Sequence, residues 1–267
     1  MATKKKTPFF MLKVPEIPGK PREKGLTIVS DRTIPLGVMR DHLEILSEAI
    51  DYVKIVDHVG MIVRNSKELV RKKIRLYKKY KISTFPGGIP FELAVLQNKV
   101  FDYLGAVKEI GFAAVEVSED VIEPLDRTTR SKILRRARGL KLDVFTEIGR
   151  KNLDTAFVLE DALWQIHEDL EAGVKKVTVE SSDVMQLIDT NPSVLLGLVE
   201  KGGIENLVFE VGVKGWPSVA VWLIQNFGPE VNLENVMMDH VLEIDAMRRG
   251  VHRYVGYQFL FEKKGNI

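Results

Sequence analysis

Acidic residues recur in this sequence at a nearly constant spacing, each at the end of a short apolar run. Helix capping explains one or two carboxylates in loops, but not glutamates at the same phase of four consecutive runs. Like charges brought together repel one another and need counter-charges, so we expect a divalent cation and lysines beside them. The runs AAVE, VFTE, VTVE, LVFE and VMMD end at Glu116, Glu147, Glu180, Glu210 and Asp239, with spacings of 31, 33, 30 and 29 residues.

The residue types favour one class of metal. The sequence has no cysteine and only five scattered histidines, a composition that disfavours a zinc site. Oxygen ligands suit Mg²⁺, which keeps several of its waters and often contacts a substrate phosphate. We predict that Mg²⁺ is bound by residues among Glu147, Glu180 and Glu210.

Two lysines are the candidate acid–base groups. Lys54 lies inside the apolar run DYVKIV, and Lys151 follows Gly149 in TEIGRK. Burial lowers the pKa of a lysine whereas neighbouring carboxylates raise it, so both directions are open for Lys54. Gly149 would let the chain turn tightly and bring Lys151 over the site. The competing interpretations are a structural ion pair for Lys54 and a solvated loop position for Lys151.

Five further residues could contact an anionic substrate. His58 in IVDHVG and His240 in MMDH follow two of the apolar runs, although packing roles compete with this interpretation. Gly87 and Gly88 in PGG offer backbone N–H groups to a phosphate, and Lys214 lies in the loop EVGVKG. We place all five in the predicted substrate-binding set.

The elements that carry these residues repeat about every thirty residues. Three earlier runs, LTIVSD, DYVK and ISTF, end at Asp31, Lys54 and Phe85, which brings the number of runs to eight. Helical patterns such as Phe91–Gly111 and Asp161–Gly173 separate the runs, and both close on a glycine. Glycine at the end of a helix, followed at once by a strand, is typical of βαβ units.

Eight such units predict a single-domain (β/α)₈ TIM barrel over residues 23–267, preceded by an irregular arm over residues 1–22. A doubly wound open sheet is the alternative, but the nearest glycine-rich stretch, PGG, is not a dinucleotide-binding motif. In a barrel the carboxyl ends of the strands meet on one face, where active sites are built. The acidic residues and lysines above would therefore converge.

The composition of the chain limits which partners and which cellular location we expect for the protein. The net charge is only +2, and the basic cluster Arg71–Lys81 has the apolar spacing of a solvated amphipathic helix, so we expect no nucleic-acid partner. No apolar run is long enough to span a membrane, and the start of the chain lacks the apolar core of a secretory signal. We expect a cytoplasmic protein that forms homo-oligomers.

The sequence resembles the phosphosulfolactate synthase family of coenzyme M biosynthesis from roughly Lys20 to Gly250. Several motifs carry the resemblance in order along the chain: KPREKGLTIVSD, DYVK, FPGG followed by FE, VEVS, TEIGRK and VNLENVMMDHVLEIDAMRRG. The resemblance implies a (β/α)₈ barrel and a carbon–sulfur lyase or synthase. The implied reaction is the Mg²⁺-dependent addition of sulfite to phosphoenolpyruvate, which gives phosphosulfolactate.

The resemblance also implies roles for individual residues. Lys151 would be the proton donor at carbon, and Lys54 and Glu147 would line the same site as catalytic residues. We add three residues at the ends of the first and fourth runs to the predicted substrate-binding set, namely Asp31, Glu116 and Ser118.

Several loops depart from the family pattern. The family has FGWGT where this chain has IVDHVG, and PGGTLFE where this chain has Ile89 and Pro90. After the sixth run an arginine suited to anion binding is replaced by Ser182, within ESSDVM. Two alternatives therefore stay open: a different anionic enol or keto acid as substrate, or a non-catalytic barrel like the family's plant heat-stress branch.

Overall fold

The computed structural model describes residues 8–9, 11–149 and 156–264, with only the backbone at residues 59, 263 and 264. Its eight strands are all parallel and form one sheet in the order β3-β2-β1-β8-β7-β6-β5-β4. The strands are β1 (Thr27–Ser30), β2 (Tyr52–Lys54), β3 (Ser83–Phe85), β4 (Ala114–Val117), β5 (Asp143–Ile148), β6 (Lys176–Val179), β7 (Leu207–Glu210) and β8 (Leu233–Met237).

The two edges of this sheet, β3 and β4, approach each other. The Ala113 N–H donates a hydrogen bond to the Thr84 carbonyl at 2.9 Å, which bridges the seam where no strand ladder forms. The sheet is therefore a nearly closed barrel, and the predicted (β/α)₈ fold is confirmed.

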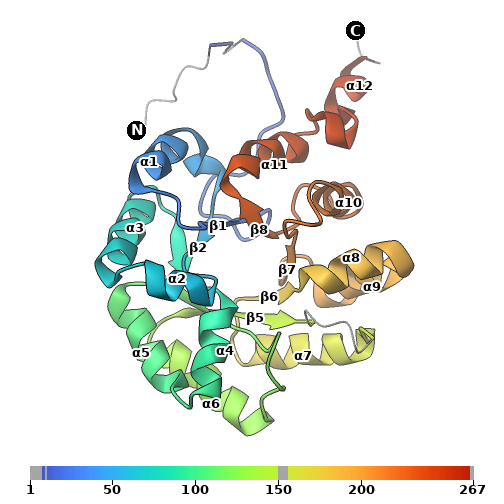
Figure 1. The fold of residues 1–267 in the computed structure, drawn as a ribbon. Coiled ribbons are helices and arrows are strands. Elements are labelled where there is room, and N and C mark those ends of the chain that lie inside the picture. The colour runs from blue at the N-terminus through green and yellow to red at the C-terminus, as the bar shows by residue number, and fades with distance from the viewer. Residues whose placement is uncertain (1–7, 10, 150–155, 265–267) are drawn as a thin grey trace.

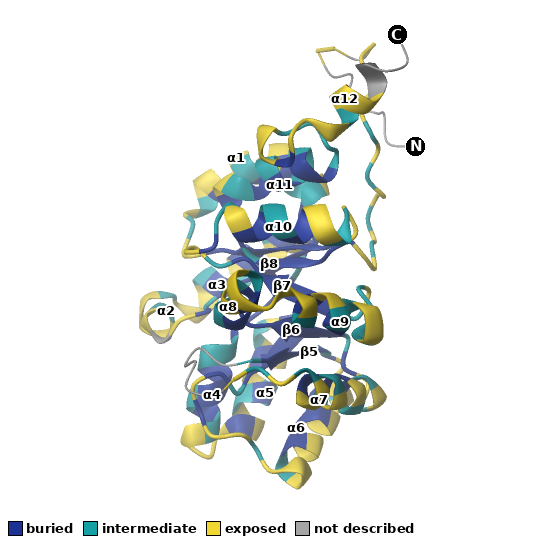
Figure 2. Cartoon of the chain, turned by 90° about the vertical axis from the view of Figure 1, so that its right-hand side faces the viewer, coloured by how far each residue is buried: buried dark blue, intermediate teal, exposed yellow. Residues whose placement is uncertain are grey.

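Helices alternate with the strands and surround the sheet (Figure 1). Figure 2 shows the strands buried, with the exposed faces of the helices turned outward. Among the described residues, no helix is both long and apolar enough to cross a membrane. The helices are α1 (Leu36–Leu46), α2 (Val59–Arg64), α3 (Lys67–Lys79), α4 (Gly88–Leu96), α5 (Val100–Ile110), α6 (Arg127–Gly139), α7 (Leu159–Glu171), α8 (Ser181–Thr190), α9 (Pro192–Gly202), α10 (Ser218–Phe227), α11 (Val241–Arg248) and α12 (Gln258–Lys264), with short 3₁₀ turns η1 (Ser47–Ala49), η2 (Met238–His240) and η3 (Arg253–Val255).

The basic cluster Arg71–Lys81 contributes to α3, which is amphipathic as its spacing indicates. Ser66 caps this helix by accepting a hydrogen bond from the Leu69 N–H at 3.2 Å. Most of its cations lie on the outer face, but Lys73 is fully buried. Its ammonium binds the carboxylate of Asp31, directly after β1. A buried charge of this kind needs a partner, and Asp31 supplies one.

Alternation along the strands separates the core into two layers. Residues that point outward from the sheet, such as Val29 and Val53, join the large core beneath the helices. Those that point inward form a second cluster: Leu26, Ile28, Tyr52, Phe85, Ala114, Phe145 and Val208. Since side chains on one face of a strand recur every two residues, the next inward positions after four of these are Lys54, Glu116, Glu147 and Glu210.

Strand β8 contains a bulge that breaks this alternation. Its register against β1 shifts between two pairs, Thr27 with Leu233 and Val29 with Val236. Leu233 and Val236 both join the outer core although they are three residues apart. Asn235 has a φ of 55°, as the extra residue of a bulge often does. Two consecutive residues, Glu234 and Asn235, therefore depart from the outer face.

Candidate active site

Lys54 forms the centre of a buried ionic cluster inside the barrel. Its ammonium lies 2.9 Å from Glu116 Oε1, 3.1 Å from Glu234 Oε1 and 3.3 Å from Glu210 Oε1. We call these four residues, which come from β2, β4, β8 and β7, the Lys54 cluster. Burial by itself lowers the pKa of Lys54, but the surrounding glutamates outweigh it and hold the pKa well above its ordinary value. This direction favours the protonated, cationic form of Lys54.

Glu234 enters this cluster through the bulge in β8. Its second oxygen accepts a hydrogen bond from Thr178 Oγ1 at 2.8 Å. Asn235, the next residue, donates through its side-chain amide to Glu210 Oε1 at 2.5 Å. The sequence pattern places the carboxylate of the eighth run at Asp239, but β8 ends at Met237 and Asp239 lies in η2. Regular alternation does not reveal Glu234, because the bulge shifts the phase by one residue.

The cluster holds more acid groups than its single lysine can neutralise. Burial, together with Glu210 and Glu116, raises the pKa of Glu147 well above its usual range. Burial also raises the pKa of Glu234 to about 8, against the opposing effect of Lys54. Further positive charge would therefore be stabilised here.

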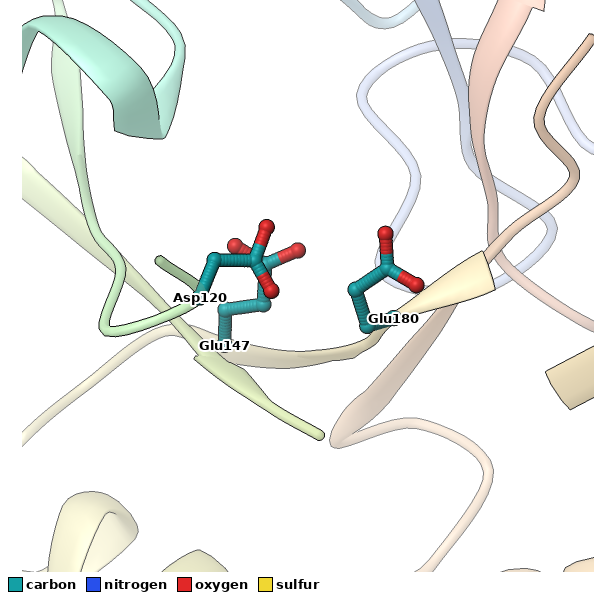
Figure 3. A group of neighbouring side chains, drawn as sticks. All are labelled: Asp120, Glu147 and Glu180. Atoms are coloured by element: carbon teal, nitrogen blue, oxygen red, sulfur yellow. The ribbon is translucent and has the colours of Figure 1, made fainter. Parts of the chain in front are cut away.

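A second group of carboxylates adjoins the first through Glu147. Asp120, Glu147 and Glu180 are all buried, and one oxygen from each lies within 4.8 Å of the others (Figure 3). We call these three residues the carboxylate triad. Within the described part of the chain, Glu147 Oε1 is buried and has no hydrogen-bond partner. Three buried oxygen donors in this arrangement have the composition of a site for a hard divalent cation.

Glu92 on α4 fixes the loop that carries Asp120. Its carboxylate accepts hydrogen bonds from Ser118 Oγ at 2.5 Å and from the N–H groups of Asp120 and Val121, both at 3.0 Å. Glu92 is only 1% exposed. A Cβ on Gly88 would lie 2.5 Å from Ser118 Cβ, so this close approach of α4 to the β4 loop requires glycine. Sequence reasoning used the FE motif only for the resemblance and missed this role.

Gly149 at the end of β5 is required for a similar reason. Its φ is +96°, and an added Cβ would overlap the Asp183 carboxylate and lie 3.2 Å from Glu180 Cβ. Glu180 in turn caps α8, accepting a hydrogen bond from the Ser182 N–H. The ESSDVM segment is thus packed against the strand end that carries Glu147.

A cavity of about 250 Å³ opens at these strand ends. It brings together eight residues that the sequence predicted for the site, and adds Arg32, Asp57, Ile89 and Asn235. Glu147 also borders a wider cleft of about 620 Å³ beside α7, further from Lys54. The eight predicted residues at the smaller cavity are Lys54, His58, Gly87, Gly88, Glu116, Ser118, Glu147 and Glu210.

Other predicted residues lie elsewhere. Asp31 is buried against α3, where the Tyr77 hydroxyl donates to it at 2.8 Å. Lys214 is exposed, and His240 stacks on Trp216 with ring centroids 4.0 Å apart. Lys151 lies outside the described residues. Glu180 belongs to the carboxylate triad, whereas Glu210 contacts Lys54 and Asn235. The catalytic, substrate-binding and metal-binding assignments all stay predictions.

The fold and site define a class of protein: a (β/α)₈ barrel with buried acidic groups at the carboxyl ends of its strands, as in barrel enzymes. A family model described as (2R)-phospho-3-sulfolactate synthase (ComA) matches residues 15–253. The chain belongs to the phosphosulfolactate synthase family, so the expected family and enzyme class are confirmed.

Curated relatives agree with this membership. The chain is similar to the phosphosulfolactate synthase of Methanocaldococcus jannaschii, with 31% identity over 86% of this chain and 92% of the relative. It is 27% identical to that of Methanothermobacter thermautotrophicus, over 91% and 95% of the two chains. It is 28% identical to that of Bacillus subtilis, over 91% and 96%.

Solved structures are similar in fold alone. DHDPS from Cyanidioschyzon merolae superposes with a TM-score of 0.56 at 10% identity, covering 90% of this chain and 79% of that one. The 3-dehydroquinate dehydratase of Aquifex aeolicus gives a TM-score of 0.50 at 11% identity, covering 83% and 98%. At such low sequence identity, the similarity to these enzymes supports the barrel fold and says nothing about the reaction.

Proposed function

We propose that this enzyme adds sulfite to phosphoenolpyruvate in a Mg²⁺-dependent reaction that yields phosphosulfolactate. The observation that carries the proposal is the carboxylate triad beside the Lys54 cluster, in a chain whose relatives are named phosphosulfolactate synthase. The cavity of about 250 Å³ is of a size for small metabolites.

The carboxylate triad fits Mg²⁺ by its donor atoms and by the buried, unpartnered Glu147 Oε1 within the described residues. When bound there by Asp120, Glu147 and Glu180, Mg²⁺ would stabilise the negative charge that develops on the substrate carboxylate. Ser118, held by Glu92 beside the triad, is a hydroxyl at the same cavity and would orient the substrate.

The chain's own residues divide the remaining work. The sulfur of sulfite forms a bond to C3 of phosphoenolpyruvate, the C2–C3 double bond becomes single, and a proton is delivered to C2. Lys54 stays protonated, so it supplies fixed positive charge to the site and does not take up the proton itself. We assign proton delivery to Lys151, as the family resemblance implies. Gly87 and Gly88, at the start of α4, supply backbone N–H groups at the cavity.

A direct assay tests this proposal. The purified protein is incubated with phosphoenolpyruvate, sulfite and Mg²⁺, and phosphosulfolactate is followed by ³¹P nuclear magnetic resonance. We expect product in the wild-type protein, none after removal of the metal with a chelator, and a loss of at least about 100-fold in Asp120→Asn. The exposed Glu123→Gln, in the same loop, is the matched control. Absence of product at high enzyme concentration would rule out this reaction.

One observation favours a second candidate function, the turnover of a different anionic enol or keto acid. Asp57 is nine-tenths buried and lines the cavity. One of its oxygens accepts from Ser30 Oγ at 2.5 Å, and the other has no hydrogen-bond partner among the described residues. This second oxygen lies 3.9 Å from His58 Nε2, and an acceptor without a hydrogen bond favours a substrate that carries a hydroxyl or amino donor. Turnover of such an acid without sulfite, lost in Asp57→Asn, would select this alternative.

A further inference from the structure

The turn after β1 places an arginine at the cavity. Residues 31–35 connect β1 to α1, and Arg32 lines the same 250 Å³ space as Lys54, Gly88 and Asn235. Its side chain is otherwise exposed to solvent.

Among the described residues that line this cavity, one cation is not already paired with a carboxylate. Asp57, Glu116, Glu147 and Glu210 all line it, and Lys54 is already engaged by its cluster. Arg32, by contrast, forms no ion pair with any described residue. An anion that enters a space rich in carboxylates needs positive charge that is not already neutralised. Arg32 is a described residue at this cavity that meets that need.

The backbone of the turn is strained. Arg32 has a φ of 43° and Thr33 a φ of 62°, so two consecutive residues other than glycine are left-handed. This conformation is unfavourable for L-residues and is a genuine outlier for a β-branched residue such as Thr33. Strain of this kind persists only where surrounding contacts impose it, and it concentrates at functional sites.

Asp31 supplies the contacts that impose it. Its carboxylate binds the ammonium of Lys73 and accepts hydrogen bonds from the Tyr77 hydroxyl at 2.8 Å and from the Ile34 N–H at 3.1 Å. The carboxylate, Lys73 and Tyr77 are each no more than 1% exposed. The Asp31 N–H also donates to the Lys54 carbonyl at 2.9 Å, which ties the turn to β2. The turn is thus anchored to a strand and to a helix.

We propose that Arg32 binds the anionic group of the substrate, and that Asp31, Lys73 and Tyr77 act as positioning residues that hold its turn at the cavity. The proposal rests on the proposed function only in taking the substrate to be an anion. It assigns Asp31 to the support of the site, in place of the direct substrate contact predicted from its position at the strand end. A guanidinium is suited to phosphate and carboxylate because it can form two parallel hydrogen bonds.

Calorimetric titration with inorganic phosphate and with phosphoenolpyruvate, in Mg²⁺ and without sulfite, tests the proposal apart from turnover. We expect Arg32→Gln to weaken binding of phosphoenolpyruvate at least tenfold and Arg32→Lys to weaken it less. Arg40→Gln, an exposed residue on α1, is the matched control and should bind like wild type. Tyr77→Phe removes one anchor of Asp31 and should weaken binding about threefold while leaving Arg32 itself intact.

The outcomes separate this proposal from the reaction assigned above. Equal affinity in wild type and Arg32→Gln, or no binding of either anion by the wild-type protein, overturns the role of Arg32. If phosphoenolpyruvate binds through Arg32 but sulfite yields no product, Arg32 stands and the proposed reaction fails. If product forms and Arg32→Gln keeps the wild-type KM, the reaction stands and the role of Arg32 fails.

Discussion

At the scale of single residues, the site is defined by how many carboxylates share one lysine. Glu116, Glu210 and Glu234 all contact Lys54, and Glu147 lies close enough to affect its pKa. Breaking such a buried network exposes uncompensated charge, so its members depend on one another. Their protonation should therefore be visible in the stability of the whole protein.

The pKa of Glu234 gives a pH dependence with a definite sign. Its value in the folded protein is about 8, raised from 4.5 by burial. The folded state therefore binds one more proton than the unfolded state between these values. The raised pKa of Glu234 therefore stabilises the folded protein fully below pH 4.5. This stabilisation is lost as the pH rises from 4.5 through 8, at up to about 1.4 kcal/mol per pH unit. Urea unfolding between pH 5 and 9 measures it.

Glu234→Gln carries a side chain that cannot ionise, so its unfolding free energy should vary less with pH over this range than that of the wild type. The exposed Glu262→Gln is the control and should keep the wild-type profile. Parallel profiles for wild type and Glu234→Gln would show that Glu234 does not hold the proton.

Whether each of these residues could be predicted from the sequence depends on whether it lies on a regular strand. Glu116, Glu147 and Glu210 lie on regular strands, so the thirty-residue period identified them. The period did not predict Glu234, because the bulge in β8 breaks the alternation. It did not predict Asp120, because that residue belongs to an irregular loop whose position depends on Glu92. Spacing predicts residues on regular elements, whereas loops are placed by contacts between residues distant in the sequence.

At the scale of elements, α4 acts as a support for the β4 loop. The close approach of Gly88 to Ser118 and the three hydrogen bonds accepted by Glu92 hold Ser118 to Val121 in place. The periodic pattern predicted the alternation of strands and helices, including α3, but it did not predict that Lys73 on that helix would be buried. A buried cation is recognisable only once its partner, here Asp31, is known to lie against it.

Glu92→Gln tests this support. The carboxylate of Glu92 now accepts hydrogen bonds from two backbone N–H groups. The side-chain amide of the variant would place an N–H donor against one of them, which should loosen the loop that carries Asp120. We expect the affinity for Mg²⁺ to fall about 10- to 100-fold, as for other residues that orient metal ligands. Calorimetric titration with Mg²⁺ measures it, with Glu123→Gln as the control in the same loop. An unchanged affinity would mean that Glu92 does not position the triad.

At the scale of the whole molecule, the barrel has one seam. All other neighbouring strands form ladders, while β3 and β4 are bridged by the hydrogen bond from Ala113 to Thr84. The eight repeats in the sequence predicted the number of strands. They could not locate the seam between β3 and β4, because closure of the barrel depends on side-chain packing across that seam. The expected homo-oligomer stays a prediction.

The seam should be visible in hydrogen exchange. Amides at an edge with few backbone partners open more readily than those inside a ladder. We therefore expect the amides of β3 and β4 to exchange at least about tenfold faster than those of β1 and β8, which each have a hydrogen-bonded strand on both sides. Equal protection in all strands would show that the barrel is fully closed in solution.

The bulge in β8 also bears on how such a barrel can evolve. An insertion of one residue in a strand normally moves every later side chain to the opposite face. Here the extra residue is absorbed locally: Leu233 and Val236 on either side both keep their places in the outer core. A barrel can thus acquire an interior polar group such as Asn235 without rebuilding the helices packed outside it, and its chemistry can diverge while its scaffold is inherited unchanged.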